Sequence, residues 1–186
     1  MRRRWKSEKP LGCIEVIEVP ITGDMKLHAD SKAQQIPKDL SNTIKDGRFD
    51  GCLGEVVFLK GLPGSVSLNT WSWDIIYKTY KIEIKTQYRT VKPKDNYSCS
   101  IPWSSTHQTP ELYVWVSLFR HEKAFICGYI TPNLFYDKAE YIKKGEEEGD
   151  NLFVERKGSY KIHMSDLWSI EGLLNCEIPR KWPRED

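Results

Sequence analysis

The pattern of apolar and polar positions divides the chain into strand-like and helix-like segments. Runs rich in aromatic and β-branched residues are typical of strands. The strongest two, at 112–119 and 124–130, are joined by a short charged turn, as in a hairpin. In all, six strands are predicted, at 13–19, 71–77, 80–88, 112–119, 124–130 and 159–164.

Helical spacing of apolar residues is clearest in the run 50–61, which ends on Gly61, a residue suited to terminate a helix. A second helix is predicted over 132–145, because Thr131 is a good N-cap and the proline after it is favoured at the first helical position. Weaker helical signals lie at 30–36 and 166–174. Loops are predicted for the polar stretches 62–70 and 89–110.

The order of these elements predicts an α/β or α+β fold. Strands outnumber the helices that would connect them, which favours a mixed central β-sheet flanked by helices. A length of 186 residues favours one domain. We place that domain at 13–186 and expect residues 1–12 to form a flexible basic N-terminal arm.

Composition narrows the classes of partner. The formal net charge is +2, so no strong overall field draws the protein to nucleic acid or to a membrane, and any basic patch must be local. None of the five cysteines forms a CxxC pair, which argues against a disulfide framework or a zinc ribbon and favours reduced thiols in a cytoplasm. No apolar run approaches the ~18 residues of a membrane helix, and no apolar segment follows the basic start as in a secretory signal.

The first candidate site residue is Asp74, a single carboxylate within the apolar run 71–77. A carboxylate in such a strand is costly unless it is paired, hydrogen-bonded or bound to a metal. The shortest hairpin, with residues 78–79 as its turn, places Asp74 opposite Glu83, whereas a longer turn would shift this register. A divalent cation removes the repulsion between two such carboxylates, and Mg²⁺ takes one or two of them.

Two further residues extend this group. Lys85 follows Glu83 by two positions, so it shares the same strand face at a distance of about 7 Å. Glu55 adds a third carboxylate on the predicted helix 50–61. Plainer interpretations remain open, in which 80–88 is an ordinary half-solvated strand and Glu55 faces solvent.

The arrangement resembles the PD-(D/E)XK nuclease superfamily. That family has a helical Glu, an Asp on a strand and a (D/E)-x-K motif on the paired strand. The matching residues here are Glu55, Asp74 and Glu83-Ile84-Lys85. The resemblance covers residues 50–90 and extends more loosely to about 140, with Trp73 in place of the proline that often precedes the Asp.

The resemblance implies a restriction-endonuclease-like core and a metal-dependent DNA endonuclease. Asp74 and Glu83 would hold Mg²⁺, or Mn²⁺ in its place, with the backbone carbonyl of Ile84. Glu55 would bind a metal or a metal-bound water, and Lys85 would serve the attacking water. The reaction implied is hydrolysis of a phosphodiester bond in DNA.

Contacts to DNA are expected beyond the catalytic strand segment. Gln87 shares the face of Lys85 and resembles an additional Gln of some family members. A local basic strip of Arg89, Lys92 and Lys94 suits a phosphate backbone, although a solvated loop explains it equally well. The polar residues 104–108 are also placed to touch phosphates, and nothing distinguishes one of them.

Two other classes of function compete with the nuclease. The first is a catalytically inactive nucleic-acid-binding or interaction module on a nuclease-like fold. The second is an unrelated α+β protein in which the carboxylates lie on the surface. If the protein is a nuclease, its small size favours a homodimer for cutting both strands of a duplex.

Overall fold

The computed structural model describes residues 16–36, 45–67, 72–148, 153–154 and 158–175. The predicted arm 1–12 lies outside the described residues. The helices are α1 (Gly23–Gln35), α2 (Lys45–Gly61), α3 (Pro132–Lys138) and α4 (Ile170–Leu174), with short 3-10 helices η2 (Trp103–Ser105) and η4 (Met164–Asp166). The strands are β1 (Ile17–Pro20), β2 (Ser65–Ser67), β3 (Ile75–Tyr77), β4 (Tyr80–Arg89), β5 (Ser98–Pro102), β6 (Leu112–Phe119), β7 (Lys123–Ile130), β8 (Glu140–Ile142), β9 (Glu147–Glu148), β10 (Phe153–Val154) and β11 (Ser159–His163).

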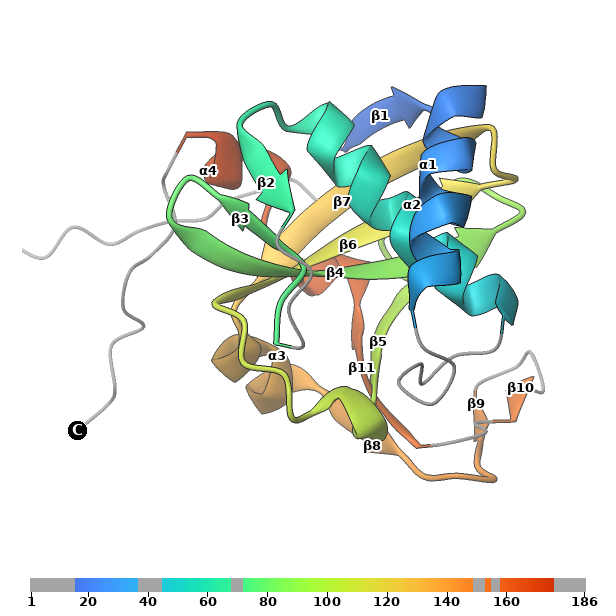
Figure 1. Ribbon diagram of the computed structural model, residues 1–186. Helices are drawn as coiled ribbons and strands as arrows, with labels where there is room; N and C mark the ends of the chain where they lie inside the picture. The colour runs from blue at the N-terminus through green and yellow to red at the C-terminus, as the bar shows by residue number, and fades with distance from the viewer. Residues whose placement is uncertain (1–15, 37–44, 68–71, 149–152, 155–157, 176–186) are drawn as a thin grey trace, which may run out of the picture.

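A curled, mixed six-stranded sheet forms the centre of the molecule, in the order β1-β7-β6-β4-β3-β2 (Figure 1). Strands β4 and β6 are parallel, and the other neighbouring pairs are antiparallel. A parallel pair needs a long crossover, and here the connection between β4 and β6 carries β5 and η2. The predicted fold class, a mixed central sheet flanked by helices, is confirmed.

The β3–β4 hairpin has the register expected from its shortest possible turn. Ile75 pairs with Ile82, and Tyr77 pairs with Tyr80. The two-residue turn is possible because Lys78 adopts a positive φ of 57°, the backbone conformation that tight hairpin turns require. This turn brings the residue before β3, Asp74, next to the middle of β4.

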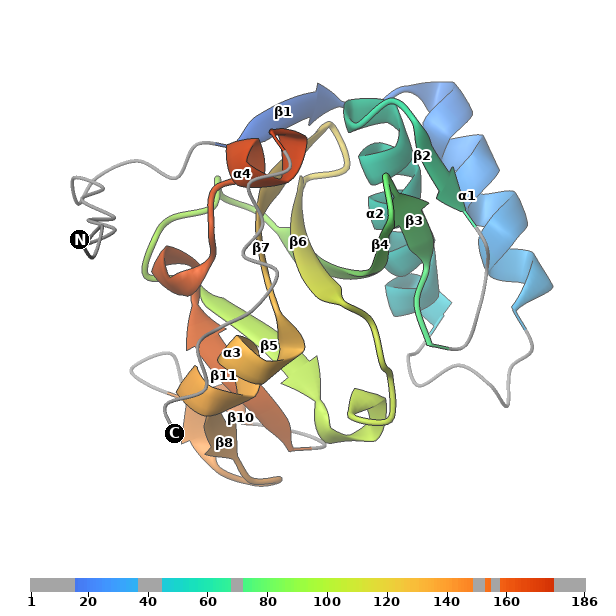
Figure 2. The ribbon, with the colours of Figure 1, turned by 90° about the vertical axis from the view of Figure 1, so that its left-hand side faces the viewer.

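Two layers cover the two faces of the sheet (Figure 2). Helices α1 and α2 pack on one face, where Leu53 and Val57 meet Ile82 and Ile84 in a fully or largely buried core. The opposite face is covered by α3 and by a three-stranded sheet in the order β5-β11-β8. There Trp115 of β6 and its neighbours form a second apolar cluster. The side chains of β6 therefore divide between these two cores.

Close packing between α2 and β4 depends on a glycine. A Cβ atom at Gly54 would lie 1.9 Å from Oγ1 of Thr86 on β4, a distance that no side chain tolerates. The missing side chain lets the helix approach the strand closely. Glu55, the next residue along α2, is thereby carried toward the strand that holds Glu83.

Several predicted boundaries were wrong. The predicted loop 62–70 contains β2, and the predicted loop 89–110 contains β5 and η2. Strand β5 forms because its alternate residues Cys99 and Ile101 are buried while its backbone pairs with β11. The pairing partner lies about sixty positions away, and the local sequence gives no sign of it.

The helices and shorter strands also differ from expectation at their ends. Thr131 caps α3 as predicted, but the helix ends at Lys138, and β8 follows because it pairs with β11. Helix α1 begins earlier than the predicted 30–36, because Thr22 accepts a hydrogen bond from the backbone N–H of Met25. Strand β3 is shorter than the predicted 71–77, and the predicted helix 166–174 is reduced to α4.

Two further expectations concern cysteines and membranes. Within the described residues, Cys52, Cys99 and Cys127 are buried free thiols. None of the helices in the described part of the chain combines the length and the apolar character that crossing a bilayer requires.

Candidate active site

The face of β4 opposite α2 carries the polar residues that the alternation predicted. Ile82 and Ile84 point into the α2 core, so Glu83 and Lys85 point to the other face. Glu83 is only 5% exposed, an unusual burial for a carboxylate. The ammonium group of Lys85 lies 5.7 Å from the ring centre of Tyr113, on the neighbouring strand β6.

The two oxygens of Glu83 have different surroundings. Oε1 accepts hydrogen bonds from Nζ of Lys85 at 2.9 Å and from Nε2 of Gln108 at 2.6 Å. Oε2 is buried and has no hydrogen-bond partner among the described residues. A buried acceptor without a partner is costly, so this oxygen is suited to a ligand that the protein does not itself supply.

Asp74 lies directly before β3 and is held against the middle of β4. Its backbone N–H donates to the carbonyl of Ile82 at 3.0 Å, and its Oδ2 accepts from the N–H of Ile84 at 2.8 Å. Burial raises the pKa of Asp74 well above its usual range, and the nearby carboxylates of Glu83 and Glu55 raise it further. The three predicted acids are thus close enough to oppose one another's ionisation.

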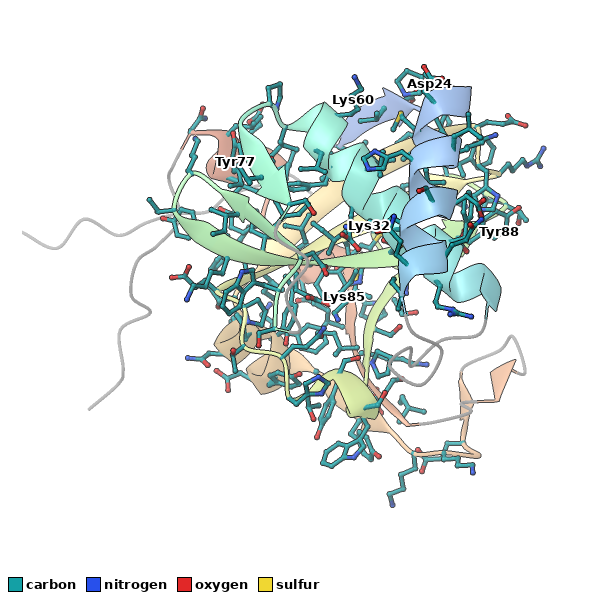
Figure 3. All side chains as sticks on the ribbon, in the orientation of Figure 1. Asp24, Lys32, Lys60, Tyr77, Lys85 and Tyr88 are labelled. Carbon is teal, nitrogen blue, oxygen red and sulfur yellow. The ribbon has the colours of Figure 1, made fainter. Side chains whose placement is uncertain are left out.

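Glu55 reaches this region from α2, and it does not face solvent. Its carboxylate forms an ion pair with Lys32 of α1, and each side chain is 12% exposed. Burial raises the pKa of Glu55, an effect that the ammonium group of Lys32 opposes. Figure 3 shows Lys32 on the helical side of β4 and Lys85 on the other. Lys32 was not predicted, because it lies in a polar helix where no spacing sets one lysine apart.

Gln108 is the second functional candidate that the sequence did not distinguish. Besides donating to Glu83, it accepts a hydrogen bond from Nζ of Lys85 at 2.7 Å through its Oε1. Its loop is fastened to β4 by Glu111, whose backbone N–H donates to the carbonyl of Lys81 and whose carboxylate accepts from the N–H of Lys81. One amide therefore holds both residues of the predicted E-x-K motif.

The predicted DNA-contacting residues fall into two groups. Nη2 of Arg89 donates to Oε1 of Gln87 at 2.7 Å and to the carbonyl of Ser98 at 3.0 Å, so this pair ties β4 to β5. Lys92 and Lys94 are exposed. Nη2 of Arg89 and the side-chain amide of Gln87 are engaged within the fold, whereas Nε of Arg89 is buried and has no hydrogen-bond partner among the described residues. Of the two exposed lysines, Lys92 places its ammonium group 6.0 Å from the ring centre of Phe125. The role of all four toward DNA stays a prediction.

A divalent metal fits the donors that this site presents. Asp74 and Glu83 supply carboxylate oxygens, the ligands that Mg²⁺ prefers, and the buried Oε2 of Glu83 is without a partner among the described residues. No three Asp, Glu, His or Cys side chains in the described ranges form a ready-made metal cage. Mg²⁺ itself needs only one or two protein carboxylates, because it keeps several water ligands. Metal binding by Glu55, Asp74 and Glu83 stays a prediction.

The backbone of Ile84 lies in the same place, since its N–H binds Asp74. Its carbonyl remains the predicted third ligand.

In comparisons with known proteins, no family model, no curated protein and no solved structure matched this chain. These comparisons therefore neither support nor exclude the predicted nuclease function.

Proposed function

We propose that this protein is a metal-dependent deoxyribonuclease, an endonuclease of the PD-(D/E)XK type that hydrolyses phosphodiester bonds with Mg²⁺ or Mn²⁺. The observation that carries the proposal is the group formed by the buried Glu83 and the partly buried Asp74 and Lys85. In it, one carboxylate oxygen of Glu83 has no partner among the described residues, and burial, together with the neighbouring acids, raises the pKa of Asp74. Such a concentration of carboxylates is costly in a fold unless it has a cation to hold.

In this proposal, Asp74 and Glu83 hold the metal together with the carbonyl of Ile84. A bound divalent ion supplies stabilisation of the charge that develops on the phosphate oxygens. Lys85 has three N–H donors, and Glu83 and Gln108 accept two of them. We assign the third to the attacking water or the phosphate, where it orients the water and stabilises the negative charge.

The presence of the complete group in this chain favours an enzyme over an inactive binding module. Glu55, Asp74, Glu83 and Lys85 are all present, and the last three are held together by β3 and β4. A protein that had lost catalysis would have no physical need to keep two shielded carboxylates beside each other. DNA is the proposed substrate, and a homodimer is the proposed assembly for cutting both strands.

A cleavage assay tests the proposal. Supercoiled plasmid and linear duplexes are incubated with Mg²⁺, Mn²⁺ or EDTA and the wild type, Asp74→Ala, Lys85→Ala or the surface control Lys26→Met. We expect cutting by the wild type and the control only with metal, and a loss of at least about 100-fold in both site variants. Equal cutting by all variants, or no cutting of any DNA by the wild type with either metal, would reject the nuclease.

A further inference from the structure

The ion pair between Lys32 and Glu55 joins α1 to α2 at the edge of the candidate site. Both side chains are 12% exposed, and Lys32 also donates to Oγ of Ser67 at 3.3 Å. Three elements therefore converge on this ammonium group: α1 carries it, α2 supplies the carboxylate, and β2 supplies the hydroxyl. A lysine held in this way has lost most of the freedom of a surface side chain.

The ion pair with Lys32 limits the ability of Glu55 to bind a metal ion. An exposed ion pair is weak because water screens its charges. A shielded ion pair is harder to break, because separating it leaves a charge unpaired. Glu55 would have to break its pair with Lys32 before it could bind a metal ion. Glu55 is close enough to Glu83 for the two charges to repel, yet it forms no metal cage with the other described acids. The cation that compensates Glu55 is already part of the chain.

The net charge of the site also favours one divalent ion over two. A bound cation favours the charged form of carboxylates beside it. With Glu55, Asp74 and Glu83 all charged, the ion-paired Lys32 and Lys85 leave one negative charge uncompensated. A single divalent ion makes the group positive by one charge, which suits a phosphodiester anion. A second divalent ion would add two more positive charges to a shielded region beside two lysines, where like charges repel strongly.

We propose that Lys32 takes the place of a second metal ion. The site then binds one divalent ion through Asp74 and Glu83, while Glu55 is a positioning residue that holds Lys32 and does not ligate the metal. This inference rests on the proposed nuclease function, and it changes the role that the family resemblance implied for Glu55.

Titration calorimetry with Mn²⁺ alone, on the metal-free full-length protein, tests the inference without any activity measurement. We expect the wild type to bind one Mn²⁺ per chain. Glu55→Gln should also bind one Mn²⁺, and its affinity for Mn²⁺ should change by less than about tenfold. Loss of a residue that supports a metal ligand typically lowers metal affinity by about tenfold or more, so a smaller change means that Glu55 is not a ligand. Lys32→Met frees Glu55 and should bind a second Mn²⁺, whereas Lys32→Arg and the exposed control Lys26→Met should bind one.

The double variant Lys32→Met/Glu55→Gln separates a ligand effect from a general loss of positive charge. We expect it to return to one Mn²⁺ per chain, because the freed carboxylate is what binds the second ion. Two ions per wild-type chain, a loss of more than about tenfold on Glu55→Gln, or a second ion that persists in the double variant would each overturn the inference. Should Lys32→Met fail to fold, Glu55→Gln still decides the matter. Absence of any Mn²⁺ binding by the wild type would instead reject the metal site and the proposed function.

Discussion

The carboxylate of Asp74 accepts a 2.8 Å hydrogen bond from the backbone N–H of Ile84, so a partly buried acid is fixed against the strand that carries the E-x-K motif. This one bond favours the charged form of Asp74 and lowers its pKa. Burial, together with Glu83 and Glu55, outweighs it and raises the pKa. In the metal-free protein, the charge on Asp74 therefore destabilises the fold.

We expect Asp74→Asn to stabilise the metal-free protein at neutral pH. The amide oxygen can still accept from Ile84, and the buried charge is gone. Because the folded pKa lies above the unfolded value of about 3.9, the wild type loses stability as pH rises between the two values, while the variant does not. Thermal unfolding in EDTA at several pH values should show a melting temperature higher by at least about 2 °C at pH 8, with the difference vanishing in acid.

Added Mn²⁺ should reverse this order. The wild type gains stability from a bound cation, and Asp74→Asn gains far less, because it has lost a carboxylate ligand. A variant that is no more stable than the wild type in EDTA at any pH would contradict the electrostatic account of Asp74.

Gln108 provides a second prediction, because it is the amide that holds Glu83 and Lys85 together. We expect Gln108→Ala to lower kcat for DNA cleavage by about 10- to 100-fold, since Lys85 is no longer fixed in position. The KM for DNA should change little. His107→Ala is the matched control, since this neighbouring side chain is exposed and bonds only to the carbonyl of Ser104 among the described residues. Equal kcat values for the two variants would show that Gln108 has no positioning role.

The approach of α2 to β4 makes a stability prediction that is independent of function. Gly54→Ala places a Cβ 1.9 Å from Oγ1 of Thr86, so we expect it to lower the free energy of unfolding by about 1–3 kcal/mol. Gly51→Ala, in the same helix, meets nothing within 4 Å and should instead stabilise by about 0.5–1 kcal/mol. Urea unfolding measures both. A second change, Thr86→Ala, should restore part of the loss, and an unchanged stability of Gly54→Ala would mean that α2 is less tightly packed.

The basic strip makes a prediction that separates DNA binding from folding. Lys92 and Lys94 are exposed, so Lys92→Ala and Lys94→Ala should each weaken DNA binding and reduce the slope of log K against log salt by about one. Arg89 bonds within the fold, and Arg89→Ala should lower stability by about 1–3 kcal/mol with little change in that slope. Fluorescence anisotropy in EDTA and thermal unfolding measure the two effects. A salt slope that falls only on Arg89→Ala would assign DNA contact to that residue instead.

The sequence correctly predicted the features that depend on residues close together in the chain. Alternation along β4 predicted which face holds Ile82 and which holds Glu83, and the short turn predicted the hairpin register. Gln108 and Lys32 were not identified, because each reaches the site from a segment that is polar throughout. Their positions follow from long-range pairing: Glu111 fastens the loop of Gln108 to β4, and the packing of α1 on α2 brings Lys32 to Glu55.

The three-stranded sheet β5-β11-β8 affects the order in which the fold can form during synthesis. Strand β11 lies between β5 and β8 and is the partner of both. Until residues 159–163 have left the ribosome, β5 lacks its pairing partner among the described strands, and the layer over the face of β4 that carries Glu83 and Lys85 is incomplete. The acids, the lysines and Gln108 are all translated earlier, yet their surroundings are finished only by one of the last strands of the domain. A nascent chain halted before β11 would therefore carry every proposed catalytic residue while the three-stranded sheet on that side of the molecule is still incomplete.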